Sequence, residues 1–265
     1  MRMHGLRART VVGVIAVVSA VLVLGLPFTG VRAQGAVDAD ADHTLRAMSD
    51  YLGHLVAFSA DYDVDTEIID HSGQKLDFVS SGSLLVQRPG KIYATRLTGS
   101  TDAEVYLAGG LLTVYGKGVN AYAQIANVGS IDAAIEAVRS QWGFDVAGAD
   151  LLYANPYPGL MTDVMSGVDL GPDIVDGIAA VHLAFRAAQV DWQVWVQPGA
   201  RPLPLKYVIT SKWVTGAPQY VVELRNWNVN PSINEQRFAF APPQGARKIT
   251  TIPTNVIGEI GEGQR

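Results

Sequence analysis

Three aspartates at alternate positions, Asp61, Asp63 and Asp65, are the first residues that suggest chemistry, because this pattern resembles the start of a calcium-binding loop. Such a loop also requires glycine at its sixth position and glutamate at its twelfth. Those positions are Thr66 and Ser72 here. In a β-strand, successive side chains alternate between the two faces, so the three carboxylates would share one face. We therefore expect the polar outer face of a strand and no metal site.

Other catalytic groups form no recognisable motif. The four histidines outside the N-terminal segment show no metal-ligand spacing: His43, His54, His71 and His182. The chain has no cysteine, and it lacks the glycine-rich loops of nucleotide-binding proteins and the serine elbow of hydrolases. We expect neither an enzyme nor a cofactor. A hydrolase whose carboxylates lie far apart in the chain is an alternative, and it would need polar groups that converge in a cleft.

One arginine lies at an unusual place between two strands. The segment VQRPGKIYA (86–94) alternates like a strand up to Arg88, is interrupted by Pro89, and then alternates again. Proline has no N–H to donate to a sheet, so it belongs at a strand end or a sheet edge. Arg88 is therefore expected at the rim of whatever the strands enclose. Two interpretations remain open: a solvated strand end, or contact with a segment that covers the rim.

The N-terminal segment predicts export. Three arginines precede an uninterrupted apolar or small run over 11–26, which is shorter than the roughly 20 residues needed to cross a membrane. Pro27 and Gly30 end the run, and Val31-Arg32-Ala33 places small residues at the positions that a signal peptidase recognises. We predict a signal peptide over 1–33 that is cleaved after Ala33; an uncleaved N-terminal anchor is the alternative. The formal net charge of −5 and the lack of a basic stripe argue against a nucleic-acid partner.

Periodicity divides the remaining chain into two runs of strands with a helical segment between them. A polar leader over 34–43 precedes a predicted helix over 45–58, where apolar residues recur at helical spacing. Alternation predicts an antiparallel meander over 59–125, with Gly109-Gly110 as a hairpin turn, and further strands over 177–229. A helical insert is predicted over about 129–175, with Ser130 as its N-cap. We expect an α+β domain over 44–250 and a polar tail over 251–265.

One face of the predicted sheet is apolar along strand after strand, and only the two helical segments can cover it. So large a sheet must curl or pack on itself, and a half-open barrel would hold either its own side chains or an apolar guest. The strands supply these candidate cavity-lining residues: Leu84, Val86, Val181, Leu183, Phe185, Trp192 and Val194. The insert supplies residues that would either plug the barrel or face a ligand: Leu151, Leu152, Leu160, Met161 and Met165. The tryptophans of the later strands either pack in the core or line a cavity: Trp192, Trp195, Trp213 and Trp227.

Three segments, in this order, resemble the family of the periplasmic lipoprotein carriers LolA and LolB: SLLVQRPGKIYATRL (83–97), EVYLAGGLLTVYGKGVNAYAQI (104–125) and RFAFAPPQGARKI (237–249). The resemblance covers about 45–249 with a poorly matching middle, and some branches of this superfamily are predicted periplasmic proteins of unknown function. It implies an incomplete antiparallel barrel under a helical lid, a periplasmic location, and non-catalytic binding of acyl chains, lipids or lipid-anchored proteins. Arg88 matches the family's arginine that donates hydrogen bonds to the lid backbone and acts as a lid latch, with Pro89 beside it.

The sequence therefore predicts a periplasmic carrier or binding protein with an apolar half-barrel cavity. Its partners would be a lipid, acyl chain or lipoprotein cargo and a membrane-bound donor or acceptor. The alternative is an envelope protein-interaction domain of the same fold whose cavity is filled by its own lid. The helical insert is longer than the lid connection usual in the family, which leaves open the size of the cavity and the identity of the cargo.

Overall fold

The computed structural model describes residues 36–143 and 148–250, which belong to one compact unit. The predicted signal peptide, most of the connection that follows Gly143 and the predicted polar tail lie outside the described residues. Among the described helices, none is long and apolar enough to cross a membrane.

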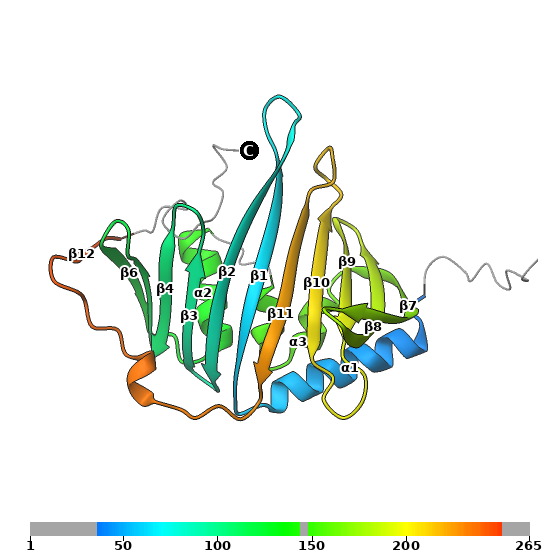
Figure 1. The fold of residues 1–265 in the computed structure, drawn as a ribbon, viewed down its shortest axis with the longest axis horizontal. Coiled ribbons are helices and arrows are strands. Elements are labelled where there is room, and N and C mark those ends of the chain that lie inside the picture. Colours follow the sequence, from blue (N-terminus) through cyan, green and yellow to red (C-terminus); the bar gives the residue numbers. More distant parts are fainter. Residues whose placement is uncertain (1–35, 144–147, 251–265) are drawn as a thin grey trace, which may run out of the picture. The chain divides into compact units, whose positions relative to one another are not determined.

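A single 12-stranded sheet forms the body of the protein, in the order β12-β6-β5-β4-β3-β2-β1-β11-β10-β9-β8-β7 (Figure 1). Its strands are β1 (Ala57–Ile69), β2 (Lys75–Gln87), β3 (Lys91–Leu97), β4 (Asp102–Ala108), β5 (Leu111–Gly116), β6 (Ala121–Ala126), β7 (Val164–Val175), β8 (Ile178–Ala187), β9 (Val190–Val196), β10 (Pro204–Ser211), β11 (Gln219–Asn228) and β12 (Arg247–Lys248). Neighbouring strands are antiparallel except for β12 and β6. The edge strands β7 and β12 do not pair with each other, so the sheet stays open. The predicted incomplete antiparallel barrel is confirmed.

Local sequence explains the meander. Gly109 and Gly110 both have positive φ, 57° and 76°, and join β4 to β5 by the two-residue turn expected from the sequence. Such turns require positive φ at both central positions, which glycine adopts without strain. The two halves of the sheet meet where β1 pairs with β11.

The helices are α1 (Ala39–His54), α2 (Ile131–Trp142) and α3 (Pro156–Leu160), with short 3-10 helices η1 (Ala149–Leu152) and η2 (Glu235–Phe238). Helix α2 begins after Ser130, whose side chain accepts a hydrogen bond from the Ala133 N–H at 3.1 Å, as the sequence predicted. Helix α1 begins earlier than expected and includes part of the predicted polar leader. Asp40 and Asp42 lie in its first turn, where negative charge interacts favourably with the helix dipole.

The predicted helical insert over 129–175 is too long. Helical structure ends at Leu160, and residues 164–175 form the edge strand β7. Gly167 and Pro172 within this segment suggested broken helical turns, but an edge strand also tolerates proline and irregular pairing. The register between β7 and β8 shifts between Asp169 and Gly171, where the Asp169 Oδ1 accepts a hydrogen bond from the Gly171 N–H at 2.7 Å.

Two large apolar clusters form most of the core, one under each long helix, and a small third cluster surrounds Val114 and Ala123. We call the two large clusters the α1 core and the α2 core. The α1 core joins the buried face of α1 to β1 and β8–β11, and the α2 core joins α2 to β1–β6. Figure 1 shows α1 and α2 in different halves of the sheet.

The closing motif FAFAPP lies against β3–β6. Phe238 is only 1% exposed, and the Phe240 ring lies 5.0–5.5 Å from the ring centres of three tyrosines: Tyr106, Tyr115 and Tyr122. Arg237 stacks over a fourth, Tyr93, at 4.5 Å. The two phenylalanines thus hold the C-terminal segment against the strands before it reaches β12.

Candidate ligand-binding cavity

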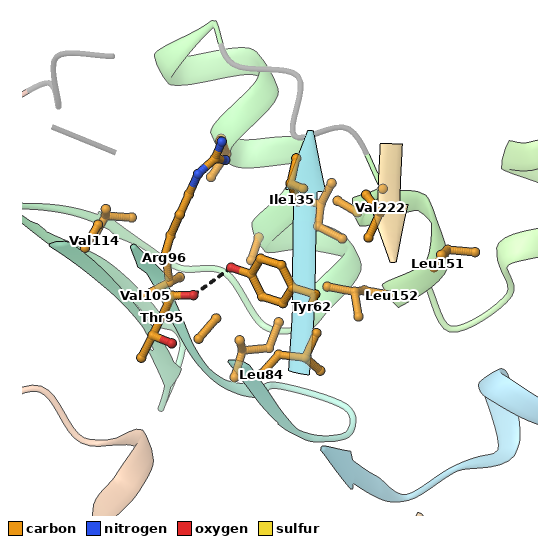
Figure 2. Close-up of a pocket in the computed structure, with 18 of the residues that line it drawn as sticks. Tyr62, Leu84, Thr95, Arg96, Val105, Val114, Ile135, Leu151, Leu152 and Val222 are labelled. Carbon is orange, nitrogen blue, oxygen red and sulfur yellow. Dashed lines mark hydrogen bonds between the residues drawn. The ribbon is translucent and has the colours of Figure 1, made fainter. Parts of the chain in front are cut away.

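A cavity of about 260 Å³ lies between the α2 half of the sheet and the helical segments above it (Figure 2). Its walls come from β1–β5, β11, α2 and η1. The lining residues are Tyr62, Val64, Leu84, Ile92, Ala94, Thr95, Arg96, Ala103, Val105, Leu112, Val114, Ala134, Ile135, Val138, Trp142, Gly148, Ala149, Leu151, Leu152, Tyr220, Val222, Leu224 and Trp227. Almost all are aliphatic or aromatic, and the volume is near the lower end of the ~300–1,000 Å³ that is typical of ligand pockets.

Strand register explains the space. Leu84, Ala94, Val105 and Val114 lie opposite one another across β2, β3, β4 and β5. Alternation directs all four to the face that α2 covers. The small side chain at Ala94, in the middle of this row, leaves room that a larger residue would fill.

One wall of the cavity depends on a glycine. Tyr62 of β1 lies over Gly82 of β2, and its hydroxyl donates a hydrogen bond to the Thr95 carbonyl oxygen of β3 at 2.6 Å (Figure 2). A Cβ at Gly82 would be 2.0 Å from that oxygen and 2.6 Å from the tyrosine ring. Only glycine at this position lets the ring cross β2.

Residues 148–160, which we call the lid, run from η1 to α3 and cover part of this half of the sheet. Leu151 and Leu152 of the lid line the cavity, whereas Leu160 and Met161 pack in or against the α1 core. Met165 lies on β7 and is 50% exposed. The apolar residues predicted for one insert therefore divide among the cavity, the core and the surface.

Arg88 connects the strands to the lid. Its guanidinium donates hydrogen bonds to the Leu152 carbonyl at 2.8 Å and to the Tyr153 carbonyl at 3.1 Å, with a longer contact of 3.5 Å to the Leu52 carbonyl in α1. Burial lowers the pKa of this guanidinium, and the charge of Asp132 acts in the opposite direction. The predicted rim residue therefore contacts the segment that covers the cavity.

Pro89 joins this contact to α2. Its carbonyl accepts a hydrogen bond from the Ile131 N–H, the first residue of α2, at 2.8 Å. The Arg88 N–H donates to the Val56 carbonyl at 2.8 Å. The Arg88-Pro89 pair thus contacts α2, the lid and the chain that follows α1.

Polar side chains tie the lid to α2. The Asp132 carboxylate accepts a hydrogen bond from the Ala154 N–H at 3.0 Å. The Tyr153 hydroxyl donates to Glu136, and it lies 3.4 Å from the Arg139 guanidinium. Burial and the bond to Glu136 raise the pKa of Tyr153 to about 12, so the phenol stays protonated and remains a donor.

A second set of polar contacts ties the lid to α1. The Tyr157 hydroxyl donates to Asp42 and accepts from the Arg46 guanidinium at 2.6 Å. The Arg46 guanidinium also lies 3.9 Å from the Tyr157 ring centre. Hydrogen bonds from Arg46 and then Tyr157 lower the pKa of the Asp42 carboxyl. Hydrogen bonds thus hold the lid at both helices.

Most of the lining residues predicted from the sequence lie elsewhere. Leu84 lines the cavity, and Val86 is fully buried in the α2 core below it. The other five belong to or pack against the α1 core: Val181, Leu183, Phe185, Trp192 and Val194. The strand pattern correctly marked their apolar face, but α1 fills that half of the barrel.

The cavity contains several residues that pattern reasoning missed. Arg96, Tyr220 and Trp142 line the cavity, but the sequence pattern did not predict them as lining residues. Trp227 also lines it and was predicted to lie either in the core or in a cavity wall. Cross-strand register from Leu84 would have found part of this wall, because Ala94 and Val105 lie opposite it. Of the other tryptophans, Trp192 is buried, Trp195 stacks on His182 and Trp213 is 65% exposed.

The acidic stripe lies along β1 beside residues of β11. Asp63 pairs with Arg225, and the Asp61 carboxylate accepts a hydrogen bond from the Asn226 side chain at 2.8 Å. Burial, Asp77 and Glu223 raise the pKa of Asp65. In the described part of the chain, no group of three or more histidines, aspartates or glutamates could hold a metal ion.

Residues 41–252 match the model of the family described as "Predicted periplasmic protein (DUF2092)", and the chain belongs to this family. The expected periplasmic location and the expected branch of predicted periplasmic proteins are confirmed. A search of curated proteins found no match.

Several solved structures resemble the chain at low identity. LprF from Mycobacterium bovis is 13% identical, with a TM-score of 0.45, over 76% of this chain and 99% of that one. Lipoprotein LppX from Mycobacterium tuberculosis is 13% identical, with a TM-score of 0.39, over 74% and 100%. A LolA superfamily protein from Nitrosomonas europaea is 10% identical, with a TM-score of 0.41, over 76% and 97%. At these scores the similarity carries no argument about function.

Proposed function

For this periplasmic protein, we propose that the cavity binds an acyl chain, either of a lipid or of a lipid-anchored protein, and that the protein carries or presents it without chemical change. The observation that carries this proposal is an apolar cavity of about 260 Å³ beneath a lid that hydrogen bonds hold in place. A membrane-bound donor or acceptor of the cargo belongs to the same proposal.

The energetics suit a reversible carrier. Burial of each methylene group contributes ~0.8 kcal/mol, so a tail with about eight buried methylenes gains roughly 6 kcal/mol before ordering costs. A closed, rigid cavity would release such a ligand slowly. A lid held by individual hydrogen bonds, each contributing ~0.5–3 kcal/mol, can open at moderate cost.

In this proposal, Arg88 is the lid latch. Its two shorter hydrogen bonds go to backbone carbonyls of the lid, at Leu152 and Tyr153. Both acceptors are backbone atoms of the protein and neither belongs to the ligand, so the latch would close whichever ligand is bound. Opening the lid would expose the Leu151 and Leu152 side chains together with the ligand.

The test is lipid analysis of the protein purified from the periplasm without detergent. Native mass spectrometry followed by organic extraction would identify any bound lipid, and titration with a fluorescent fatty acid would measure uptake by the delipidated protein. We expect a stoichiometric lipid or saturable uptake. The variant Ala94→Leu fills the cavity and should weaken uptake, whereas Ala179→Leu, at an exposed position of β8, should not.

A second function has one observation in its favour: the α1 half of the barrel is filled by the protein itself, with Leu183 fully buried and Val194 only 1% exposed. An envelope interaction domain could have both halves closed to lipid. A lipid-free mass together with no fatty-acid uptake would contradict the carrier proposal and support this alternative.

A further inference from the structure

One aromatic side chain crosses the floor of the cavity. Tyr62 of β1 lines the cavity, and its ring lies over Gly82 of β2. Its hydroxyl reaches the next strand, β3, where it donates to the Thr95 carbonyl at 2.6 Å. The ring is therefore held at two ends, by the backbone of β1 and by a hydrogen bond to β3.

The sheet is built to receive this ring. Tyr62 and Gly82 are cross-strand partners, and glycine has no side chain to fill the space over β2. The Ser83 N–H of β2 donates to the Thr95 side-chain hydroxyl at 3.0 Å. Thr95 thus accepts one hydrogen bond from β2 at its side chain and another from Tyr62 at its carbonyl.

The lining residues on the two sides of the ring come from different elements. Figure 2 shows Val105 and Val114, of β4 and β5, on one side of Tyr62. Val222 of β11 and Leu151 of η1 lie on the other side. The strand order agrees, because β11 borders β1 on the side away from β2, and β4 and β5 lie beyond β2 and β3. The ring is thus a ridge between two parts of the cavity.

We call these the lid part, next to Val222 and Leu151, and the inner part, next to Val105 and Val114. The lid part adjoins the latch, because Leu151 is followed by Leu152, whose carbonyl accepts a hydrogen bond from Arg88. Opening of the lid would therefore uncover the lid part first. A tail that enters there and extends toward the inner part meets the Tyr62 ring.

The ridge does not move with the lid. Both partners of its hydrogen bond, Tyr62 and Thr95, lie on strands in the middle of the sheet. Rotation of the ring away from β2 would separate the hydroxyl from the carbonyl, and leaving such groups unpaired in a partly buried site is unfavourable. The ridge is therefore present before a ligand binds and stays in place when the lid opens.

We infer that Tyr62 sets the length of the acyl tail that the protein accepts, and that the tail of its ligand ends at this ring. This inference rests on the proposed function and narrows the class of ligand. Protein interiors are close-packed, so a fixed ring excludes any atom that would take its place. Methylenes buried in the lid part contribute to binding, whereas those of a longer tail stay in contact with water.

The first test measures affinity against tail length. The delipidated protein is titrated with saturated fatty acids from octanoate to octadecanoate, in steps of two methylenes and below their micelle concentrations, and each displaces a fluorescent fatty acid. Each step should tighten binding roughly fifteenfold while the added methylenes are buried, and less than about twofold once they remain in water. We expect the wild-type protein to show this change of slope within the series.

A variant assigns the limit to the ring. Tyr62→Val removes the ring but keeps a β-branched side chain that suits a strand. It joins the two parts of the cavity, so the steep rise should continue for at least one further member of the series. Tyr122→Val is the control, because that ring packs against Phe240 and does not line the cavity. The control should keep the wild-type limit.

A second measurement needs no variant. A fatty acid of the limiting length, with a photoreactive diazirine at its terminal carbon, is cross-linked to the wild-type protein, and mass spectrometry locates the label. We expect the label at Tyr62. A label in β4 or β5 would show that the tail passes the ring, and it would overturn the inference even if Tyr62→Val does not fold.

The outcomes separate this inference from the proposed function. An affinity that rises steeply through the whole series to octadecanoate would overturn the inference and leave the carrier function standing. A limit that Tyr62→Val does not move would do the same. Failure of the wild-type protein to bind any of these acids would instead contradict the proposed function, and the inference with it.

Discussion

Replacing Arg88 by methionine should open the lid without unfolding the sheet. Methionine keeps an apolar stem beside Phe58, whose ring centre is 5.8 Å from the guanidinium, but it removes the donors to the Leu152 and Tyr153 carbonyls at 2.8 and 3.1 Å. Hydrogen bonds from a charged donor contribute ~1.5–3 kcal/mol each, and water would partly replace them at the freed carbonyls. We therefore expect closure of the lid to weaken by about 2 kcal/mol, which is roughly a thirtyfold change in the opening equilibrium.

Hydrogen exchange measures that equilibrium directly. Lid amides such as that of Ala154, which donates to Asp132, should exchange about thirtyfold faster in Arg88→Met, while amides of β9 and β10 keep their wild-type rates. Lys91→Met is the matched control, because Lys91 is a cation of the same hairpin but pairs with Glu235 and not with the lid. Unchanged lid exchange, or equal acceleration over the whole sheet, would refute the latch and leave Arg88 as a residue that only supports a strand end.

Three further perturbations test other contacts of the structure. Asp42→Asn should lower the melting temperature above about pH 4 and have little effect near pH 2. The hydrogen bond from Arg46 lowers the pKa of Asp42 in the folded protein below its usual 3.8. The stabilisation from the carboxylate is therefore complete above pH 3.8 and is lost as the pH falls through the lower folded-state pKa. A melting-temperature difference that does not depend on pH would contradict this. Gly82→Ala should lower the free energy of unfolding in urea by ~1–3 kcal/mol, because the new Cβ would lie 2.0 Å from a carbonyl oxygen of β3. Gly99→Ala is the control and should have little effect, since the space around Gly99 is open. Similar losses in both variants would argue against the close approach of β3 to Gly82. Phe238→Ala, which empties a site that is only 1% exposed, should cost ~3–5 kcal/mol in the same assay, and a loss below about 1 kcal/mol would show that the C-terminal segment is not part of the folded unit.

Several local features could be predicted because their signals are local. Ser130 caps α2, Gly109-Gly110 joins β4 to β5, and the meander predicted over 59–125 coincides with β1–β6. Each depends on residues that are neighbours in the chain. The position of Arg88 at a rim followed from Pro89 by the same kind of reasoning, since proline cannot continue a strand ladder.

The location of the cavity could not be predicted in this way. The alternating patterns of β2–β3 and β8–β9 both mark an apolar face, yet α1 fills one half of the sheet and the cavity lies in the other. Arg96 was overlooked because an arginine near a strand end usually points to solvent, and its inward position depends on how residues far apart in sequence align across five strands.

By itself, the sequence determined the antiparallel meander, the two long helices, the apolar face of the sheet and the place of Arg88 at a rim. These follow from periodicity, turn chemistry and backbone sterics, which act over a few residues. Only the tertiary structure decided that residues 164–175 form an edge strand, that α1 closes one half of the barrel, and that Arg88 donates to the lid while Arg96 lines the cavity. The physical reason is that burial and packing depend on which surfaces meet, and a periodic pattern marks a face as apolar without specifying what covers it.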